Sequence, residues 1–125
     1  MEENLKQILL KDICSRLPYK IKGVLSYDKD KEIFTIEGCE IEKGILYLSN
    51  SEGCHVDDFK TFLRNISSMT EEETEEYKQF LEELEGYVYS IDCVPQIDWL
   101  NAHYFDYRGL IEKGLALEAP AGMYN

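Results

Sequence analysis

Residues 20–48 read KIKGVLSYDKDKEIFTIEGCEIEKGILYL, and this stretch decides the class of fold. It contains short runs rich in β-branched and aromatic residues at 20–27, 32–37 and 45–48, a composition typical of β-strands. The sequences DKD and EKG separate the runs and are typical of tight turns. Strands joined by tight turns predict a small antiparallel meander, and an SH3-like barrel is one form in which such a meander closes.

The segment before these strands predicts an amphipathic helix over residues 3–17, because apolar side chains recur there at helical spacing. Pro18 ends the helix, since a proline disfavours the helical region for the residue before it. The predicted apolar face comprises Leu5, Ile8, Leu9, Ile13 and Leu17, and the opposite, polar face comprises Lys6, Gln7, Lys11 and Asp12.

The segment after the strands predicts further helices. Residues 56–63 carry apolar side chains at helical spacing and favour a short helix, with a closing strand as the alternative. Thr70 and Glu73 have the spacing of a capping box, which predicts the start of a helix that runs to about residue 85 and ends at Gly86. The buried stripe of this helix is expected to comprise Tyr77, Phe80, Leu81 and Leu84.

Residues 87–91 alternate aromatic and β-branched side chains and predict another strand. Residues 96–103 predict a short helix, and Asp106 is placed to cap a final turn after it. We therefore expect a single α+β domain over residues 1–118, in which a small antiparallel sheet accompanies an N-terminal helix, an acidic middle helix and short C-terminal helices. The remaining residues, 119–125, have the composition of a C-terminal tail.

The formal net charge is −12, from 25 acidic and 13 basic residues. Nucleic acids and anionic membranes attract clusters of Lys and Arg, so direct nucleic-acid binding is not expected and a basic partner is favoured over an acidic one. The N-terminal segment carries acids where a signal peptide is positive, and no run of about 18 apolar residues is present. We therefore expect a cytoplasmic protein that does not enter a membrane.

Four cysteines and two histidines raise the question of a metal site. Structural zinc sites use close ligand pairs, because a tight loop orients two ligands around the metal. The cysteines at 14, 39, 54 and 93 are scattered, and the glycines form no phosphate-binding pattern. We therefore expect reduced cysteines that pack as small apolar residues, with no metal and no other cofactor.

The segment richest in functional groups is DWLNAHYFDYR, residues 98–108. Aromatic side chains with Arg and His are typical of recognition surfaces, although the same aromatic residues could instead pack the C-terminal segment onto the sheet. A third interpretation pairs His103 with Asp98 or Asp106 as a general base, but no nucleophile motif accompanies it and no catalytic residue is assigned. The candidate binding residues are Trp99, His103, Tyr104, Tyr107 and Arg108.

Residues 71–85 contain eight glutamates and one lysine. Such a run is typical of the solvated face of an amphipathic helix. It could also hold a basic partner or imitate the backbone of a nucleic acid.

Two segments resemble a family of small proteins of no known activity from gut bacteria, their phages and integrated mobile elements. They are FKTFLRNISSMTEEE at 59–73 and DWLNAHYFDYRGLIEKGLALEAP at 98–120. The resemblance implies a phage or mobile-element origin, and a non-enzymatic accessory protein that binds a host or phage protein. The alternative is an inhibitor of host defence, either an acidic nucleic-acid mimic or a nucleotide sponge. For a sponge, Arg108 with Tyr104 and Tyr107 is the grouping that places a cation beside aromatic rings.

Overall fold

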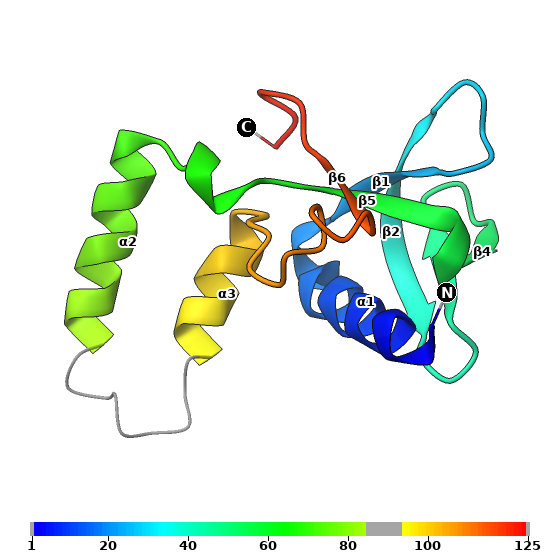
Figure 1. Ribbon diagram of the computed structural model, residues 1–125, viewed down its shortest axis with the longest axis horizontal. Helices are drawn as coiled ribbons and strands as arrows, with labels where there is room; N and C mark the ends of the chain where they lie inside the picture. The colour runs from blue at the N-terminus through cyan, green and yellow to red at the C-terminus, as the bar shows by residue number, and fades with distance from the viewer. Residues whose placement is uncertain (1, 85–93, 125) are drawn as a thin grey trace.

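The computed structural model describes residues 2–84 and 94–124. Within these residues the chain forms one six-stranded sheet and three α-helices, which confirms the α+β class (Figure 1). The predicted strand at 87–91 and the predicted helix end at Gly86 lie outside the described residues.

The sheet has the strand order β4-β3-β2-β1-β5-β6, with every described pair antiparallel except β5 and β6. The predicted meander is confirmed, because β1, β2 and β3 pair in sequence order. Among the described residues the sheet stays open, since its two edge strands, β4 and β6, do not pair with each other and no barrel closes. The strands are β1 (Lys22–Leu25), β2 (Ile33–Glu40), β3 (Ile45–Leu48), β4 (Gly53–His55), β5 (Phe59–Leu63) and β6 (Ala116–Glu118).

The strand connections use the predicted turn chemistry. The Asp28 carboxylate accepts hydrogen bonds from the backbone N–H groups of Asp30 (3.0 Å) and Glu32 (3.2 Å), which fixes the turn between β1 and β2. Between β2 and β3, Gly44 adopts the left-handed conformation with φ of +66°. Where β1 pairs with β5, a Cβ atom on Gly23 would lie 2.4 Å from the Lys60 carbonyl oxygen, so this close approach requires glycine.

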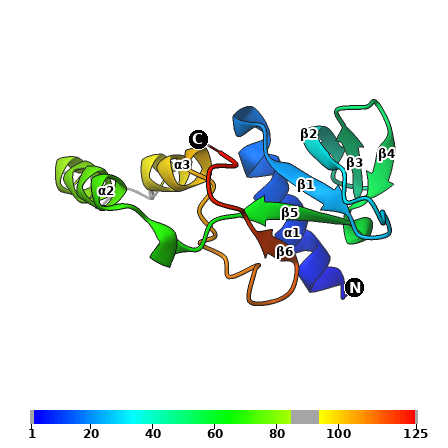
Figure 2. The ribbon, with the colours of Figure 1, turned by 90° about the horizontal axis from the view of Figure 1, so that it is seen from above.

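Helix α1 (Glu3–Arg16) confirms the predicted N-terminal helix and lies against one face of the sheet (Figure 2). One part of its predicted pattern is wrong, because Asp12 is fully buried and not on a solvated face. Its carboxylate is tolerated in the interior because two arginines bind it, as described below. The buried apolar side chains between α1 and the sheet include Leu9, Leu10, Ile13, Ile21, Leu25, Ile36, Leu46, Leu48, Phe59 and Leu63.

The helix favoured for residues 56–63 is wrong, and the alternative of a closing strand is correct. A single 3-10 turn (Val56–Asp58) leads into β5, whose side chains alternate between buried and half-buried positions. Because β5 lies between β1 and β6, its backbone is hydrogen-bonded on both sides. This tertiary pairing outweighs the local helical spacing of the apolar residues.

Helix α2 (Glu71–Leu84) and helix α3 (Val94–Ala102) lie side by side at one end of the molecule, away from the sheet (Figures 1 and 2). The capping box is confirmed: the Thr70 hydroxyl accepts from the Glu73 N–H (3.1 Å), and the Glu73 carboxylate accepts from the Thr70 N–H (3.0 Å). The predicted buried stripe is wrong, since Tyr77 and Phe80 are only half-buried and Leu81 is 38% exposed. A helix that does not lie on the sheet has no core in which to bury a stripe.

The chain returns to the sheet after α3. Both carboxylate oxygens of Asp106 accept backbone N–H groups, from Leu110 and Ile111 (2.9 Å each), so Asp106 caps a turn as predicted. Residues 119–124, expected to form a tail, follow β6 and remain attached to the sheet. The Ala119 N–H donates to the Leu63 carbonyl (2.7 Å), and the Tyr124 hydroxyl donates to the Phe62 carbonyl (2.8 Å).

Candidate functional site

The molecule divides into a body, which is α1 with the sheet, and an arm, which is α2 with α3. Arg64, directly after β5, joins the two. Its guanidinium binds Glu73 of α2 through two hydrogen bonds, of 2.6 Å from Nη2 to Oε1 and 2.8 Å from Nη1 to Oε2. The same guanidinium lies 4.3 Å from the centre of the Phe105 ring. The hydrogen bonds from Arg64 lower the pKa of Glu73 to about 2, so this carboxylate is charged at neutral pH.

Trp99 lies at the contact between α2 and α3. Its ring is 3.9 Å from that of His103, to which it is stacked, and 4.9 Å from that of Tyr77 on α2. The indole N–H donates to Glu76 (3.1 Å), and the Gln96 amide donates to the Tyr77 hydroxyl (2.6 Å). Trp99 is half-buried, so part of its ring holds the arm together and part stays accessible.

The structure does not assemble the catalytic arrangement considered for His103. Its Nδ1 atom lies 2.8 Å from the Trp99 carbonyl oxygen, in its own helix. Asp98 is exposed, and the Asp106 carboxylate accepts backbone N–H groups instead of binding the imidazole. Among the described hydrogen bonds, His103 therefore has neither predicted carboxylate as a partner.

Tyr107 and Arg108 belong to a buried ion cluster in the body. Arg108 Nη1 lies 2.6 Å from Asp12 Oδ1, and Arg16 binds the same carboxylate through Nε (2.9 Å) and Nη2 (3.1 Å). The Arg16 Nη2 atom also donates to the Phe105 carbonyl (2.7 Å), and its guanidinium faces the Tyr107 ring. Asp12 and Arg16 are fully buried, whereas the Arg108 side chain is 27% exposed. The cluster ties α1 to the segment that leads out of the arm.

Tyr104 makes a third, separate contact. Its ring stacks on that of Tyr124 with the centres 3.6 Å apart, and its hydroxyl donates to the Tyr19 carbonyl. Burial raises the pKa of Tyr124, so its phenol stays protonated and continues to donate. The five candidate residues therefore do not form one continuous surface: they are divided among the arm, the ion cluster and the C-terminal segment.

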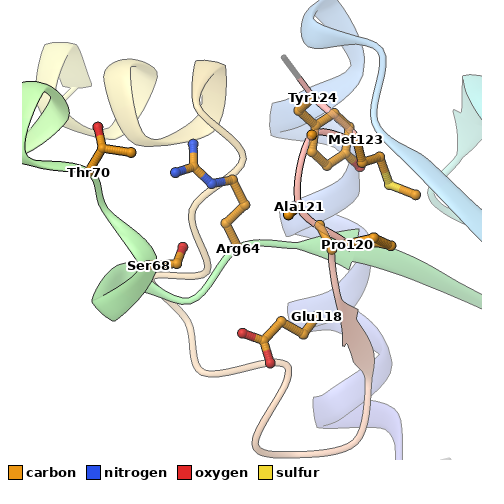
Figure 3. Close-up of a pocket in the computed structure, with 10 residues that line it drawn as sticks. Arg64, Ser68, Thr70, Glu118, Pro120, Ala121, Met123 and Tyr124 are labelled. Carbon is orange, nitrogen blue, oxygen red and sulfur yellow. The ribbon is translucent and has the colours of Figure 1, made fainter.

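A pocket of about 400 Å³ lies between Arg64, the start of α2 and the C-terminal segment (Figure 3). Sequence reasoning missed this pocket because it assigned residues 119–125 to a tail. The charge of Arg64 is balanced by Glu73, and the exposed Glu118 adds a negative charge to the lining. The pocket therefore gives an anionic ligand no net attraction. Its lining comprises Arg64, Ser68, Thr70, Glu118, Ala119, Pro120, Ala121, Gly122, Met123 and Tyr124.

The outer face of α2 is exposed and acidic. Glutamates occupy seven of the positions in residues 71–84, and Lys78 is the one basic residue there. Leu81, 38% exposed, adds an apolar group one turn after Tyr77. The exposed carboxylates of α2 comprise Glu71, Glu72, Glu75, Glu82 and Glu83, together with Glu76, which accepts the Trp99 indole N–H on the side of α3.

In residues 2–84 and 94–124, no cluster of three or more His, Cys, Asp or Glu side chains has the arrangement of a metal site. None of the helices in the same ranges has the length and apolar character needed to cross a membrane.

No protein-family model, curated protein or solved structure significantly matches the chain. The function must therefore be inferred from the geometry described above.

Proposed function

We propose that this chain is a non-enzymatic accessory protein of a phage or integrated mobile element, and that it binds another protein through the arm. The observation that carries the proposal is that α2 is exposed and yet held in a fixed position. None of the side chains at 71–83 is buried, yet the helix is held in one orientation by Arg64 and by the aromatic cluster around Trp99. The phage or mobile-element origin is supported only by the resemblance of two sequence segments.

The energetics of α2 support a role for its exposed face. Fixing a residue in a helix costs about 1–2 kcal/mol of backbone conformational entropy, and burial of apolar surface usually offsets that cost. Helix α2 has no fully buried side chain at 71–83 and depends on its capping box, its ion pair to Arg64 and its contacts with α3. A helix stabilised in this way adds little to the core, but it presents a defined surface.

The chemistry of that surface indicates a basic partner. Exposed carboxylates predominate among the side chains of α2, and Leu81 is an exposed apolar side chain of the same helix. Complementary charge accelerates association and disfavours acidic partners, and an exposed apolar side chain adds contact area. The half-buried ring of Trp99, on α3, is a further partly accessible apolar group of the arm.

Retention of host proteins on the immobilised chain, identified by mass spectrometry, tests the proposal. In one variant Glu75, Glu82 and Glu83 are replaced by Gln, and in a matched control Glu32, Glu37 and Glu42 are replaced. All six side chains are exposed, and each variant loses three negative charges. We expect the α2 variant to lose a specifically retained basic protein and the control variant to keep it.

Two results would contradict the proposal. Equal loss in both variants would mean that the overall charge, and not the arm, retains the partner. A retained nucleotide without any protein would favour the nucleotide sponge, although the charges that line the pocket give an anionic ligand no net attraction.

The acidic face also supports the second candidate, an inhibitor that imitates nucleic acid. Such a decoy must compete with DNA or RNA for its target. The decoy mechanism is supported if the retained protein binds nucleic acid, if the wild-type chain displaces the nucleic acid from it, and if the α2 variant does not. The decoy would then be a more specific form of the proposed binding function.

A further inference from the structure

Two of the cysteines that are scattered in the sequence meet in the fold. Cys14 lies in the last turn of α1, and Cys39 lies on β2, 25 positions later. Their Sγ atoms are 2.6 Å apart. A disulfide bond has a sulfur–sulfur distance of about 2.05 Å, so only a small displacement separates this pair from a covalent link.

The surroundings of the pair favour a covalent link over a metal site. Neither thiol forms part of a cluster of three or more metal-ligating side chains within the described residues. Both cysteines are half-buried, so a small reagent can reach them from solvent. Cys54, also half-buried, lies on β4 and is the natural control.

We propose that Cys14 and Cys39 form a reversible disulfide bond by exchange with a low-molecular-weight disulfide. One protein thiolate attacks the reagent disulfide, forms a mixed disulfide and releases one thiolate of the reagent. The second protein thiolate then attacks the protein sulfur, forms the Cys14–Cys39 bond and releases the other half of the reagent. The protein loses two hydrogens and two electrons, and the reagent gains them as two thiols.

The position of the bond determines its effect. It joins the end of α1 to β2, two elements of the body, and it closes a loop that the folded state already contains. A link of this kind restricts the unfolded chain and raises the stability of the folded form. The bond does not involve α2, so we expect binding through the arm in both the reduced and the oxidised protein.

The thiolate fraction of Cys14 limits the rate of the exchange. Burial and the neighbouring Cys39 raise the pKa of the Cys14 thiol to about 12, so little thiolate is present at neutral pH. The exchange is therefore slow at neutral pH and faster at higher pH, and an excess of a small thiol reverses it.

The test treats the native protein with oxidised glutathione and measures its mass and its linked peptides. We expect the loss of two hydrogens, a peptide that joins Cys14 to Cys39, and a higher melting temperature for the oxidised form. Cys54→Ser should behave like the wild type. Cys14→Ser and Cys39→Ser should each form only a mixed disulfide and show no rise in melting temperature.

Linked peptides that contain Cys54 or Cys93, or wild-type protein that keeps all its thiols, would overturn the proposal. If a serine variant fails to fold, the peptide map of the wild-type protein decides alone.

Discussion

The body and the arm are built by different interactions. In the body, α1 and the sheet enclose a core of fully buried aliphatic and aromatic side chains, and the charged groups inside it are paired. In the arm, the described side chains of α2 at 71–83 are exposed or half-buried, and the helix is held by a few polar and aromatic contacts. The difference indicates that the body supplies the stability and the arm supplies a surface.

The largest effect is expected from Asp12→Ala in the body. The substitution leaves the fully buried Arg16 without its carboxylate partner and removes the ion pair to Arg108. Breaking a buried pair from one side costs about 3–5 kcal/mol. Chemical denaturation should show a loss of this size. The control Asp57→Ala removes an exposed carboxylate and should change the free energy of unfolding by less than about 0.5 kcal/mol.

A similar small loss in both variants would show that the ion cluster does not stabilise the body. In that case the buried charges would serve to favour this fold over alternative folds, without adding net stability.

An intermediate effect is expected from Glu73→Gln, which removes the ion pair between body and arm. The pair should contribute about 1 kcal/mol, mostly to the docking of α2. Because the folded-state pKa of Glu73 is lowered from 4.5 to about 2, its contribution is present above pH 4.5 and is lost as the pH falls toward 2. Trp99 is the one tryptophan of the chain and lies in the arm, so its fluorescence reports this step.

In the wild type, Trp99 fluorescence should change between pH 4.5 and 2, and Glu73→Gln should show the acid-like signal already at pH 7. Glu71→Gln, a neighbouring exposed glutamate, should titrate like the wild type. If Glu73→Gln keeps the wild-type signal at pH 7, the arm does not depend on the ion pair.

Sequence reasoning succeeded where local chemistry decides the structure. The Thr70–Glu73 capping box and the Asp28 turn are formed by neighbouring residues, so their spacing alone predicted them. It failed for β5, because the partners that make this segment a strand lie far away in the sequence. The burial of Asp12 was equally hidden, since one of its two arginines is 96 positions away.

The candidate site was predicted only in part. The composition of residues 98–108 marked a candidate binding segment, which stays a prediction, but it did not reveal that the side chains contact three separate parts of the structure. Neither Arg64 as the joint between body and arm nor the pocket beside it has a local signature. Both depend on the return of the C-terminal segment to β5, which only the fold reveals.

The smallest effects come from a matched pair of Thr→Val substitutions, which conserve the shape of the side chain. Thr61 in the body is buried, and its hydroxyl has no hydrogen-bond partner among the described residues. Thr74 in the arm is exposed and donates to the Thr70 carbonyl (2.9 Å). Removing an unpaired buried hydroxyl should raise the free energy of unfolding by about 1 kcal/mol, whereas removing a solvated, bonded one should lower it by about 0.5 kcal/mol.

The opposite signs are the informative part of this pair, and denaturant titration of both variants measures them. They arise because the body gains from apolar burial and the arm depends on its polar contacts. A loss of stability in Thr61→Val would mean that the hydroxyl is satisfied inside the body, which would then depend on polar contacts as the arm does. A gain in Thr74→Val would mean that α2 owes its order to apolar contact, and the argument that its exposed face is held in place by polar contacts for a partner would fail.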